Sequence, residues 1–301
     1  MLTSEYIKKI AKEYGASVCG IGSLDLFEGE DISRDPKMIL PKAKCIIGFG
    51  FAVPKGLYQA MENQAQYYTY TTLGKSCIDT ELGEIFLLKM GRIIENEGYD
   101  ACLQRTVPHL KVKGDTTTNP EVLDTYELKF SSPVAEGKPA PDVLIDYNKA
   151  AMACGIGKAG LSGHILSPKY GPYIRYTFII TDAPLETDAP LTQDICDYCG
   201  ACKKACVGNA ISDDGINSWQ CAVYYKGAHK SNPFMTDDFL QNHPEREKII
   251  NGEKIFDAES ARALYPELRF LPITGSRYEA CLCGKKCDIA CYKHLKEKNL
   301  I

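Results

Sequence analysis

The alternation of apolar and polar residues at the start of the chain predicts a helix followed by two strands. The segment YIKKIAKEYG (6–15) has apolar residues at helical spacing and ends at a glycine. The short apolar run VCGIG (18–22) follows it. Residues 44–53, KCIIGFGFAV, are almost continuously apolar and are closed by Pro54, which is typical of a strand buried on both faces. We therefore expect a core strand at 44–53.

Further along the chain, helices and strands alternate around one long irregular segment. Apolar positions between residues 80 and 97 recur at helical spacing and stop before Gly98. Residues 106–141 lack a sustained period, and loops of this length are usually functional or disordered. The strings DVLIDY, NKAAMAC and YIRYTFIITD then predict a strand, a helix and a second buried strand. The segment APLETDAPLT has prolines but no period, so we expect domains at 1–190 and 191–301.

Composition and charge restrict the classes of partner. The 301 residues are 45% hydrophobic, which is ample for a packed core. The 35 lysines and arginines against 39 acidic residues give a net charge of −4, so we expect that nucleic acid is not a partner. The first residues have no export signal, and no apolar run approaches the roughly 18 residues of a membrane span. We therefore expect a cytoplasmic protein without membrane contact.

The 14 cysteines are distributed unevenly along the chain. Disulfides do not persist in a reducing cytoplasm, so most of these cysteines should be thiols or metal ligands. Five are isolated and are expected in the core as small apolar residues: Cys19, Cys45, Cys77, Cys102 and Cys154. The other nine follow residue 195. The candidate chemistry therefore lies in the last third of the chain.

The run CDYCGACKKAC (196–206) has cysteines spaced by two, two and three residues. Disulfide partners, a zinc site and an iron–sulfur cluster are the alternatives. Zinc sites use two C-x2-C pairs some fifteen residues apart, whereas this contiguous run matches the bacterial pattern for a [4Fe–4S] cluster, in which the fourth cysteine binds a second cluster. One departure from that pattern is Val207, which stands where proline normally follows.

A second cluster requires additional cysteines, and the chain has them at Cys221 and in CLCGKKCDIAC (281–291). We assign one cluster to Cys196, Cys199, Cys202 and Cys291, and the other to Cys206, Cys221, Cys283 and Cys287. Cys281 is then left over, although it could replace Cys283. The sequence thus predicts two [4Fe–4S] clusters.

The residues before the clusters resemble a known family. The segment CGIGKAGLSGHILSPKYGPYIRYTFIITDAPL (154–185), followed by the cysteine run, is similar to reductive dehalogenases and epoxyqueuosine reductases, and PKAKCIIGFGFAVP resembles their early strand. The resemblance implies an α+β protein, with a nitroreductase-like α/β sandwich domain that holds cobalamin and a ferredoxin-like domain with two [4Fe–4S] clusters. A D-x-H-x-x-G cobalamin motif is absent, which agrees with a base-off cofactor and also with no corrinoid.

The resemblance also implies roles for individual residues. Glycines permit close approach to a flat ligand, and the expected cofactor-binding residues are Gly155, Gly157, Gly160, Ser162, Tyr170 and Tyr173, of which the tyrosines could instead simply pack. Arg175 is the expected cationic catalytic residue, with a solvent-exposed strand edge as the alternative. Four residues compete for the role of proton donor, namely Asp142, Asp146, Tyr126 and Tyr147, and we favour Asp146 and Tyr126. The five histidines share no metal-ligand spacing and are expected to be ordinary core or surface residues.

The function that follows is an oxidoreductase that uses cobalamin to dehalogenate or deoxygenate a small organic substrate, with ferredoxin or flavodoxin as electron donor. Lysine pairs at 203–204 and 285–286 are either a solvated face or a docking surface for that acidic donor. Three alternatives remain: an epoxyqueuosine reductase acting on tRNA, an electron-transfer protein without catalysis, and a reductase of a separate corrinoid protein. We disfavour the tRNA alternative because the chain ends soon after its last cysteine and has no basic excess.

Overall fold

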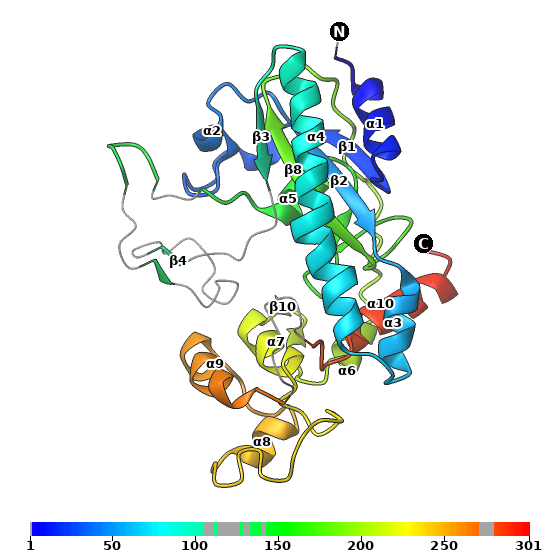
Figure 1. The fold of residues 1–301 in the computed structure, drawn as a ribbon, viewed down its shortest axis with the longest axis vertical. Helices are drawn as coiled ribbons and strands as arrows, with labels where there is room; N and C mark the ends of the chain where they lie inside the picture. The colour runs from blue at the N-terminus through cyan, green and yellow to red at the C-terminus, as the bar shows by residue number, and fades with distance from the viewer. Residues whose placement is uncertain (1, 105–110, 113–126, 129–132, 140–142, 271–279) are drawn as a thin grey trace.

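The computed structural model describes residues 2–104, 111–112, 127–128, 133–139, 143–270 and 280–301. Its centre is a four-stranded antiparallel sheet in the order β1-β2-β8-β3 (Figure 1). The strands are β1 (Val18–Gly22), β2 (Cys45–Ala52), β8 (Ile174–Thr181) and β3 (Ala101–Gln104). The predicted strands at 18–22, 44–53 and 173–182 are therefore confirmed.

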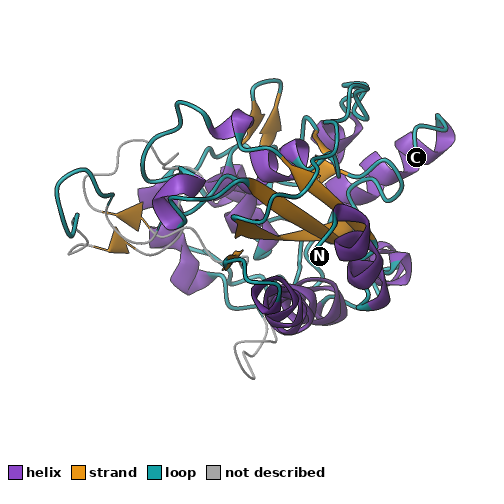
Figure 2. Ribbon diagram, turned by 90° about the horizontal axis from the view of Figure 1, so that it is seen from above, coloured by secondary structure: helices purple, strands orange, loops and turns teal. Residues whose placement is uncertain are grey.

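Helices cover both faces of this sheet, as Figure 2 shows from above. Successive side chains of a strand point to opposite faces. On β2, Ile47 and Phe49 therefore share a core with α1 (Ser4–Glu13) and α4 (Gly83–Asn96), whereas Ile46 packs with α5 (Tyr147–Ala153) on the other face. The near-continuous apolar run on β2 is explained by this burial on both faces.

Phe86 of α4 is the centre of the aromatic packing on the first face. Its ring lies edge-on to the rings of Phe49 and Phe51, with centroids 4.8 and 5.1 Å away. Replacing Phe86 by alanine is expected to lower the free energy of unfolding by about 4 kcal/mol, because the cavity cannot refill. Guanidinium titration under anaerobic conditions measures this change. The matched control is Ile85→Ala on the same helix, where the side chain is 56% exposed and the expected change is below about 0.5 kcal/mol.

The helix predicted at 80–97 begins about ten residues earlier in the structure, because a second helical segment precedes α4. Residues Tyr70–Leu82 form a π-helix, η2, that continues directly into α4. A π-helix has more than 3.6 residues per turn, so the α-helical spacing used for the prediction does not reveal it, and such segments are frequent at functional sites. This helix carries Tyr70 and Asp79 to the start of β8.

The predicted strand in DVLIDY is wrong for residues 143–146, which form neither strand nor helix. Asp146 is instead the N-cap of α5, and its carboxylate Oδ1 accepts hydrogen bonds from the backbone N–H of Asn148 and Lys149 at 2.8 and 3.1 Å. A capping carboxylate at this position begins a helix, which competes with extension of the strand. The helix predicted in NKAAMAC is confirmed as α5.

Short elements complete the part of the chain before the predicted linker. Before the linker these are η1 (Asp25–Phe27), α2 (Pro36–Ile39), α3 (Lys55–Glu62), β4 (Lys111–Val112), β5 (Glu127–Leu128) and the hairpin β6 (Lys158–Ala159) with β7 (Ile165–Leu166). The predicted linker has no helix or strand, and it is attached to the sandwich where Asp188 Oδ2 accepts from the backbone N–H of Ile21 at 2.8 Å.

The cysteine-rich part lies below the sheet in Figure 1. Its elements are α6 (Ala201–Ala205), β9 (Ile211–Ser212), β10 (Gly215–Ile216), α7 (Ser218–Tyr225), α8 (Arg246–Ile250), α9 (Ala258–Leu264), η3 (Tyr265–Glu267) and α10 (Lys286–Glu297). It has its own core around Trp219 and Tyr224, but Cys281 and Ile289 join the core of the sheet. The domain boundary at residue 190 stays a prediction. None of the helices in the described ranges is long and apolar enough to cross a membrane.

Candidate functional site

Four of the predicted cluster ligands surround one small cavity between α6 and α10. Cys196, Cys199, Cys202 and Cys291 all line it. The first three come from the compact run around α6, and Cys291 is brought in by α10. This is the first set of cysteines that the sequence assigned to one cluster, and the fold brings together members that are about ninety residues apart in the chain.

The second predicted set also gathers in space. In addition to burial, the charges of Cys283 and Cys206, which lie close to the Cys221 thiol, raise its pKa. Burial and the charges of Cys283 and Cys221 raise the pKa of the Cys287 thiol in the same way. Burial, with these neighbours, raises the pKa of Cys221 to about 12. A protonated buried thiol is the resting state without metal, and iron would take the place of the proton.

The surroundings of Cys281 differ from those of Cys283. Their sulfurs lie 3.8 Å apart, but Cys281 is fully buried in the core of the sheet and its charge acts on Tyr67, Tyr70 and Tyr225. Cys283 instead faces Cys221 and Cys287. Because Cys283, and not Cys281, is a charged neighbour of both Cys221 and Cys287, we favour Cys283 as the fourth thiol of the second set.

Both sets fit an iron–sulfur cluster in the chemistry of their donors. Each offers four thiols, and the backbone N–H of Ala210 donates to Cys206 Sγ at 3.2 Å, a contact of the kind that tunes cluster potentials. The assignment of the eight cysteines as metal ligands stays a prediction.

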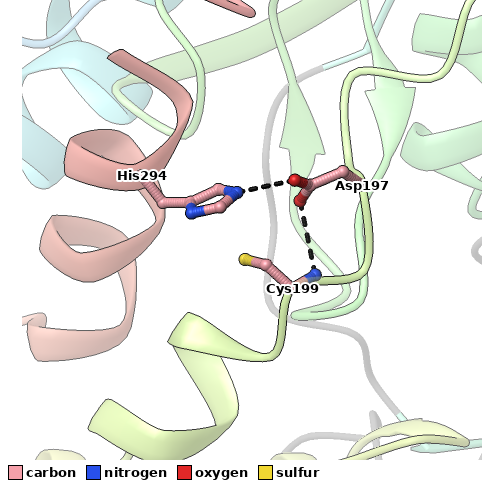
Figure 3. A group of neighbouring side chains, drawn as sticks. All are labelled: Asp197, Cys199 and His294. Atoms are coloured by element: carbon pink, nitrogen blue, oxygen red, sulfur yellow. Dashed lines mark hydrogen bonds and ion pairs between the residues drawn. The ribbon is translucent and has the colours of Figure 1, made fainter. Parts of the chain in front are cut away.

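An Asp197–His294 pair borders the first set (Figure 3). His294 Nε2 lies 2.7 Å from Asp197 Oδ2, and the backbone N–H of Cys199 donates to Asp197 Oδ1 at 3.3 Å. The hydrogen bond from His294 lowers the pKa of Asp197. Ligand atoms of Asp197, Cys199 and His294 lie within 4.8 Å of one another, a separation that a metal ion could bridge. Because Cys199 also belongs to the first set, we regard this pair as the outer edge of that site.

A cavity of about 170 Å³ opens where β8 begins, and Arg175 lies in its wall. Its lining comes from the sandwich and from the start of α10: Tyr58, Tyr70, Tyr147, Asn148, Gly163, His164, Ile165, Pro172, Ile174, Arg175, Tyr176, Lys285 and Asp288. Arg175 forms a bidentate ion pair with Asp79 of η2. Burial alone would lower the pKa of Arg175, but the Asp79 carboxylate outweighs burial and raises it. The guanidinium is therefore permanently charged and held in place.

Three polar residues from two segments also line this cavity. His164 Nδ1 lies 2.8 Å from Asp288 Oδ1, and Lys285 Nζ lies 2.9 Å from Asp288 Oδ2. Asp288 is 3% exposed. Burial would raise the pKa of Asp288, but His164 and Lys285 outweigh it and lower the pKa. Since Nδ1 is engaged by Asp288, Nε2 is the ring nitrogen of His164 left for a ligand in the cavity.

The hairpin that carries His164 depends on the glycines of the predicted cofactor stretch. The backbone N–H of Gly163 donates to Gly160 O, and that of Gly160 donates to His164 O, both at 2.9 Å. Gly163 has φ +75°, a conformation that glycine adopts without strain. The turn therefore positions His164 at the start of β7.

The expected cofactor-binding residues are not in the lining of this cavity. Gly157 packs so closely that a Cβ would meet Ile165 at 2.3 Å, and a Cβ on Gly155 would meet the Ala189 carbonyl oxygen at 2.6 Å. Gly160 is likewise packed against Leu166, and Ser162 is buried. Close packing against other parts of the protein thus explains why glycine is needed at these positions, and no ligand has to be invoked.

The tyrosines of the expected set behave differently from each other. Tyr173 is stacked between Tyr58 and Tyr292, with ring centroids 3.6 and 4.1 Å away and rings within 7° of parallel. Burial raises the pKa of Tyr173. Tyr170 is half-buried, with Lys169 Nζ 5.2 Å from its ring centroid. Of the two alternatives for Tyr173, packing is the one that its contacts favour.

A corrinoid does not fit the cavity beside Arg175. Pockets for drug-sized ligands span about 300–1,000 Å³, and a corrinoid exceeds such ligands in size, whereas this cavity measures about 170 Å³. The glycines that would allow a flat ligand to approach are already in contact with protein. The residues around this cavity therefore do not fit a corrinoid held inside it.

The two favoured proton donors have different outcomes. Asp146 caps α5, so its carboxylate is engaged by backbone N–H groups, and it lies next to the lining residues Tyr147 and Asn148. Tyr126 and Asp142 lie outside the described residues. The roles of Arg175, Asp146 and Tyr126 stay predictions.

Sequence reasoning missed His164, Asp79, Lys285 and Asp288. His164 was treated as an ordinary histidine, although its place inside the glycine stretch was a usable signal. The prediction that Lys285 belongs to a solvated or docking lysine pair is wrong, because its side chain is largely covered and is paired with Asp288. The positions of Lys285 and Asp288 among the cysteines of CLCGKKCDIAC were the available signal.

Known proteins resemble this chain in sequence. No family model matches it. Epoxyqueuosine reductase of Bacillus subtilis is 25% identical over 253 residues, which cover 82% of this chain and 53% of that protein. Tetrachloroethene reductive dehalogenase of Sulfurospirillum multivorans is 33% identical over 66 residues, 21% of this chain and 13% of that protein. The chain thus spans about half the length of the epoxyqueuosine reductase that it matches.

Solved structures resemble it in fold. An epoxyqueuosine reductase from Bacillus subtilis has a TM-score of 0.52 at 17% identity, covering 98% of this chain and 82% of that chain. An epoxyqueuosine reductase with an epoxyqueuosine-modified tRNA stem loop has a TM-score of 0.50 at 19% identity, covering 95% and 69%. A reductive dehalogenase, whose structure suggests a mechanism for B12-dependent dehalogenation, has a TM-score of 0.50 at 16% identity, covering 87% and 35%. The predicted α+β class is therefore confirmed.

One prediction must be corrected on this basis. We expected that nucleic acid is not a partner, and the tRNA complex of an epoxyqueuosine reductase with this fold contradicts that expectation. A net charge is a sum over the whole surface, whereas phosphate contacts need only a few well-placed cations. The relatives named here are reductases, in agreement with the predicted oxidoreductase, and the chain resembles the epoxyqueuosine reductases and reductive dehalogenases in both sequence and fold.

Proposed function

We propose that the chain is an iron–sulfur reductase that removes an epoxide oxygen at the cavity beside Arg175, with a modified tRNA nucleoside as substrate. The observation that carries this proposal is the convergence of two kinds of group on one cavity. Lys285 and Asp288 flank the predicted cluster ligand Cys287, and the same two residues share the cavity with His164 and Arg175. An electron source and a proton source would therefore meet at one place.

Two clusters would be held by the two sets of cysteines, with Cys283 rather than Cys281 in the second. When bound, such clusters supply electrons one at a time. Conversion of an epoxide into an alkene consumes two electrons and two protons and releases the oxygen as water. The chain's own residues have to bind the substrate, exclude water and deliver a proton.

The roles of the cavity residues follow from their contacts. Arg175, fixed by Asp79, would stabilise the negative charge that develops on the departing oxygen. His164, held through Nδ1 by Asp288, would donate a proton from Nε2. Asp288 would act as a positioning residue, since it holds the imidazole through Nδ1, and Lys285 would in turn hold the Asp288 carboxylate.

The tRNA substrate is supported better than the small organic substrate that the sequence suggested. Matches to the epoxyqueuosine reductases of Bacillus subtilis and Bacillus cereus cover 82% and 80% of this chain, whereas the match to the dehalogenase of Sulfurospirillum multivorans covers 21%. Ferredoxin or flavodoxin as the electron donor stays a prediction.

The test uses anaerobic protein with reconstituted clusters, a chemical reductant and tRNA that contains epoxyqueuosine. After nuclease digestion, mass spectrometry of the nucleosides is expected to show loss of one oxygen atom from the modified base. Failure to convert this tRNA by protein that contains both clusters would overturn the proposal, and turnover of chlorinated ethenes in its place would support dehalogenation.

The same protein tests the disagreement with cobalamin. We expect incubation with hydroxocobalamin followed by desalting to leave no corrinoid on the protein, because the cavity is too small. Iron and sulfide should remain near about eight each per chain. A corrinoid absorption band that stays with the protein would contradict this expectation.

A further inference from the structure

A further cavity, of about 340 Å³, lies between α3, the segment 282–286 and α10. Its floor is apolar and is formed by Met61, Leu282 and Ile289, which are 2%, 5% and 7% exposed. The volume is twice that of the cavity beside Arg175 and falls within the range of small-molecule sites. We call it the α3–α10 cavity.

The wall of the α3–α10 cavity is the segment that carries two predicted ligands of the second cluster. Leu282 and Gly284 line it and flank Cys283, and Lys286 lines it next to Cys287. Neighbouring Cα atoms are about 3.8 Å apart, so a molecule touching Leu282 and Gly284 would lie within about 10 Å of the Cys283 sulfur. Electrons can pass from a molecule in the cavity to a cluster bound at Cys283 over this distance, without any bond between the molecule and the iron.

The rim of the cavity is polar, and one of its lysines has no acidic partner among the described residues at the rim. Lys286 Nζ lies 3.2 Å from Ser231 Oγ, which is neutral, so its charge is not cancelled by that partner. Lys293 forms an ion pair with Glu62. This differs from Lys285, whose charge is balanced by Asp288 inside the protein. An apolar floor with an ammonium at the rim suits a flat aromatic ligand that bears an anionic group.

We propose that the α3–α10 cavity binds a planar aromatic redox carrier with an anionic tail, of the flavin mononucleotide class, which reduces the clusters. This inference rests on the proposed function, because it takes the second cluster as electron acceptor. The reduced flavin gives up two electrons and two protons and becomes oxidised flavin. Each of the two clusters accepts one electron, and the protons pass to solvent.

Flavin mononucleotide itself is the probe, used with the full-length anaerobic protein containing both clusters. Quenching of its fluorescence is expected to saturate with one site per chain. Riboflavin, which lacks the phosphate, is expected to bind about ten times more weakly, a factor that one charge-assisted contact supplies. Mixing with reduced flavin mononucleotide is expected to bleach the visible absorbance of the clusters.

Two variants and one control make the test specific. Lys286→Gln should weaken binding of flavin mononucleotide about tenfold, and Ala290→Phe, which fills the cavity from α10, should abolish it. Lys298→Gln, at the end of the same helix and outside the lining, should leave it unchanged. Iron content is measured for each variant, so that loss of a cluster is not mistaken for loss of binding.

The inference is overturned if flavin mononucleotide shows no saturable binding, or if the cavity variants that keep their iron bind it as well as the parent protein does. Binding is measured without any tRNA substrate. An inactive enzyme that still binds flavin mononucleotide would therefore refute the proposed function alone, and an active enzyme that does not bind it would refute this inference alone.

Discussion

Replacing Cys283 by serine is expected to lower the iron content from about eight to about four atoms per chain, because one of the two clusters loses a thiolate ligand. Cys283 lies close enough to Cys221 and Cys287 for its charge to act on both thiols, and the hydrogen bond with Cys281, together with burial, raises its own pKa well above the usual value. Electron delivery to the cavity beside Arg175 should fail with it, so reduction of the substrate should fall below detection. Iron and sulfide analysis together with the visible spectrum measures the loss.

Cys281 provides a matched control for this experiment. It is two residues away, its sulfur is only 3.8 Å from that of Cys283, and its thiol is fully buried among core residues of the sheet. Cys281→Ser should therefore retain about eight iron atoms, although burial of the hydroxyl is expected to cost some stability. If Cys281→Ser loses iron and Cys283→Ser does not, the assignment of the two residues is reversed.

Replacing His164 by glutamine is expected to lower kcat by roughly 10²- to 10⁴-fold, the usual contribution of a positioned general acid. A glutamine amide can still donate a hydrogen bond to Asp288, so the local structure should survive, but it cannot transfer a proton. Steady-state reduction of epoxyqueuosine-containing tRNA measures the effect. The substrate's KM should change little, because the proposed role of His164 lies in the chemical step.

The control is His243→Gln. His243 is exposed, accepts a hydrogen bond from the backbone N–H of Glu245, and is not among the residues that line the cavity. Its kcat and iron content should match those of the parent protein. Full activity in His164→Gln would remove His164 from the mechanism and would return Asp146 and Tyr126 to first place as candidate proton donors.

Stacked tyrosines and the Arg175–Asp79 ion pair explain why the cavity beside Arg175 is small. Tyr58 and Tyr173 stack at 3.6 Å, and Arg175 is drawn towards η2 by Asp79. These contacts come from α3, β8 and η2, three segments whose spacing in the sequence gives no sign that they meet. The cavity is small but open to solvent, so it can accept a small reacting group while the rest of a large substrate remains outside.

The sequence by itself determined the elements whose signal is local. The apolar runs of β2 and β8 and the period of α1 and α4 predicted these elements, since burial on one or two faces leaves a pattern in neighbouring residues. The cysteine run at 196–206 predicted a metal cluster for the same reason, because its ligands are only a few residues apart. Local capping by Asp146 was the exception, and it turned a predicted strand into the start of a helix.

The tertiary structure alone decided which distant residues meet. The choice between Cys281 and Cys283 depends on which sulfur faces Cys221, more than fifty residues away, and no spacing encodes that orientation. Likewise, the contact of His164 with Asp288 joins a hairpin to the first turn of α10. Such contacts are fixed by packing of the whole chain, so the site could be recognised only after the sheet, the hairpin and the last helix had been placed together.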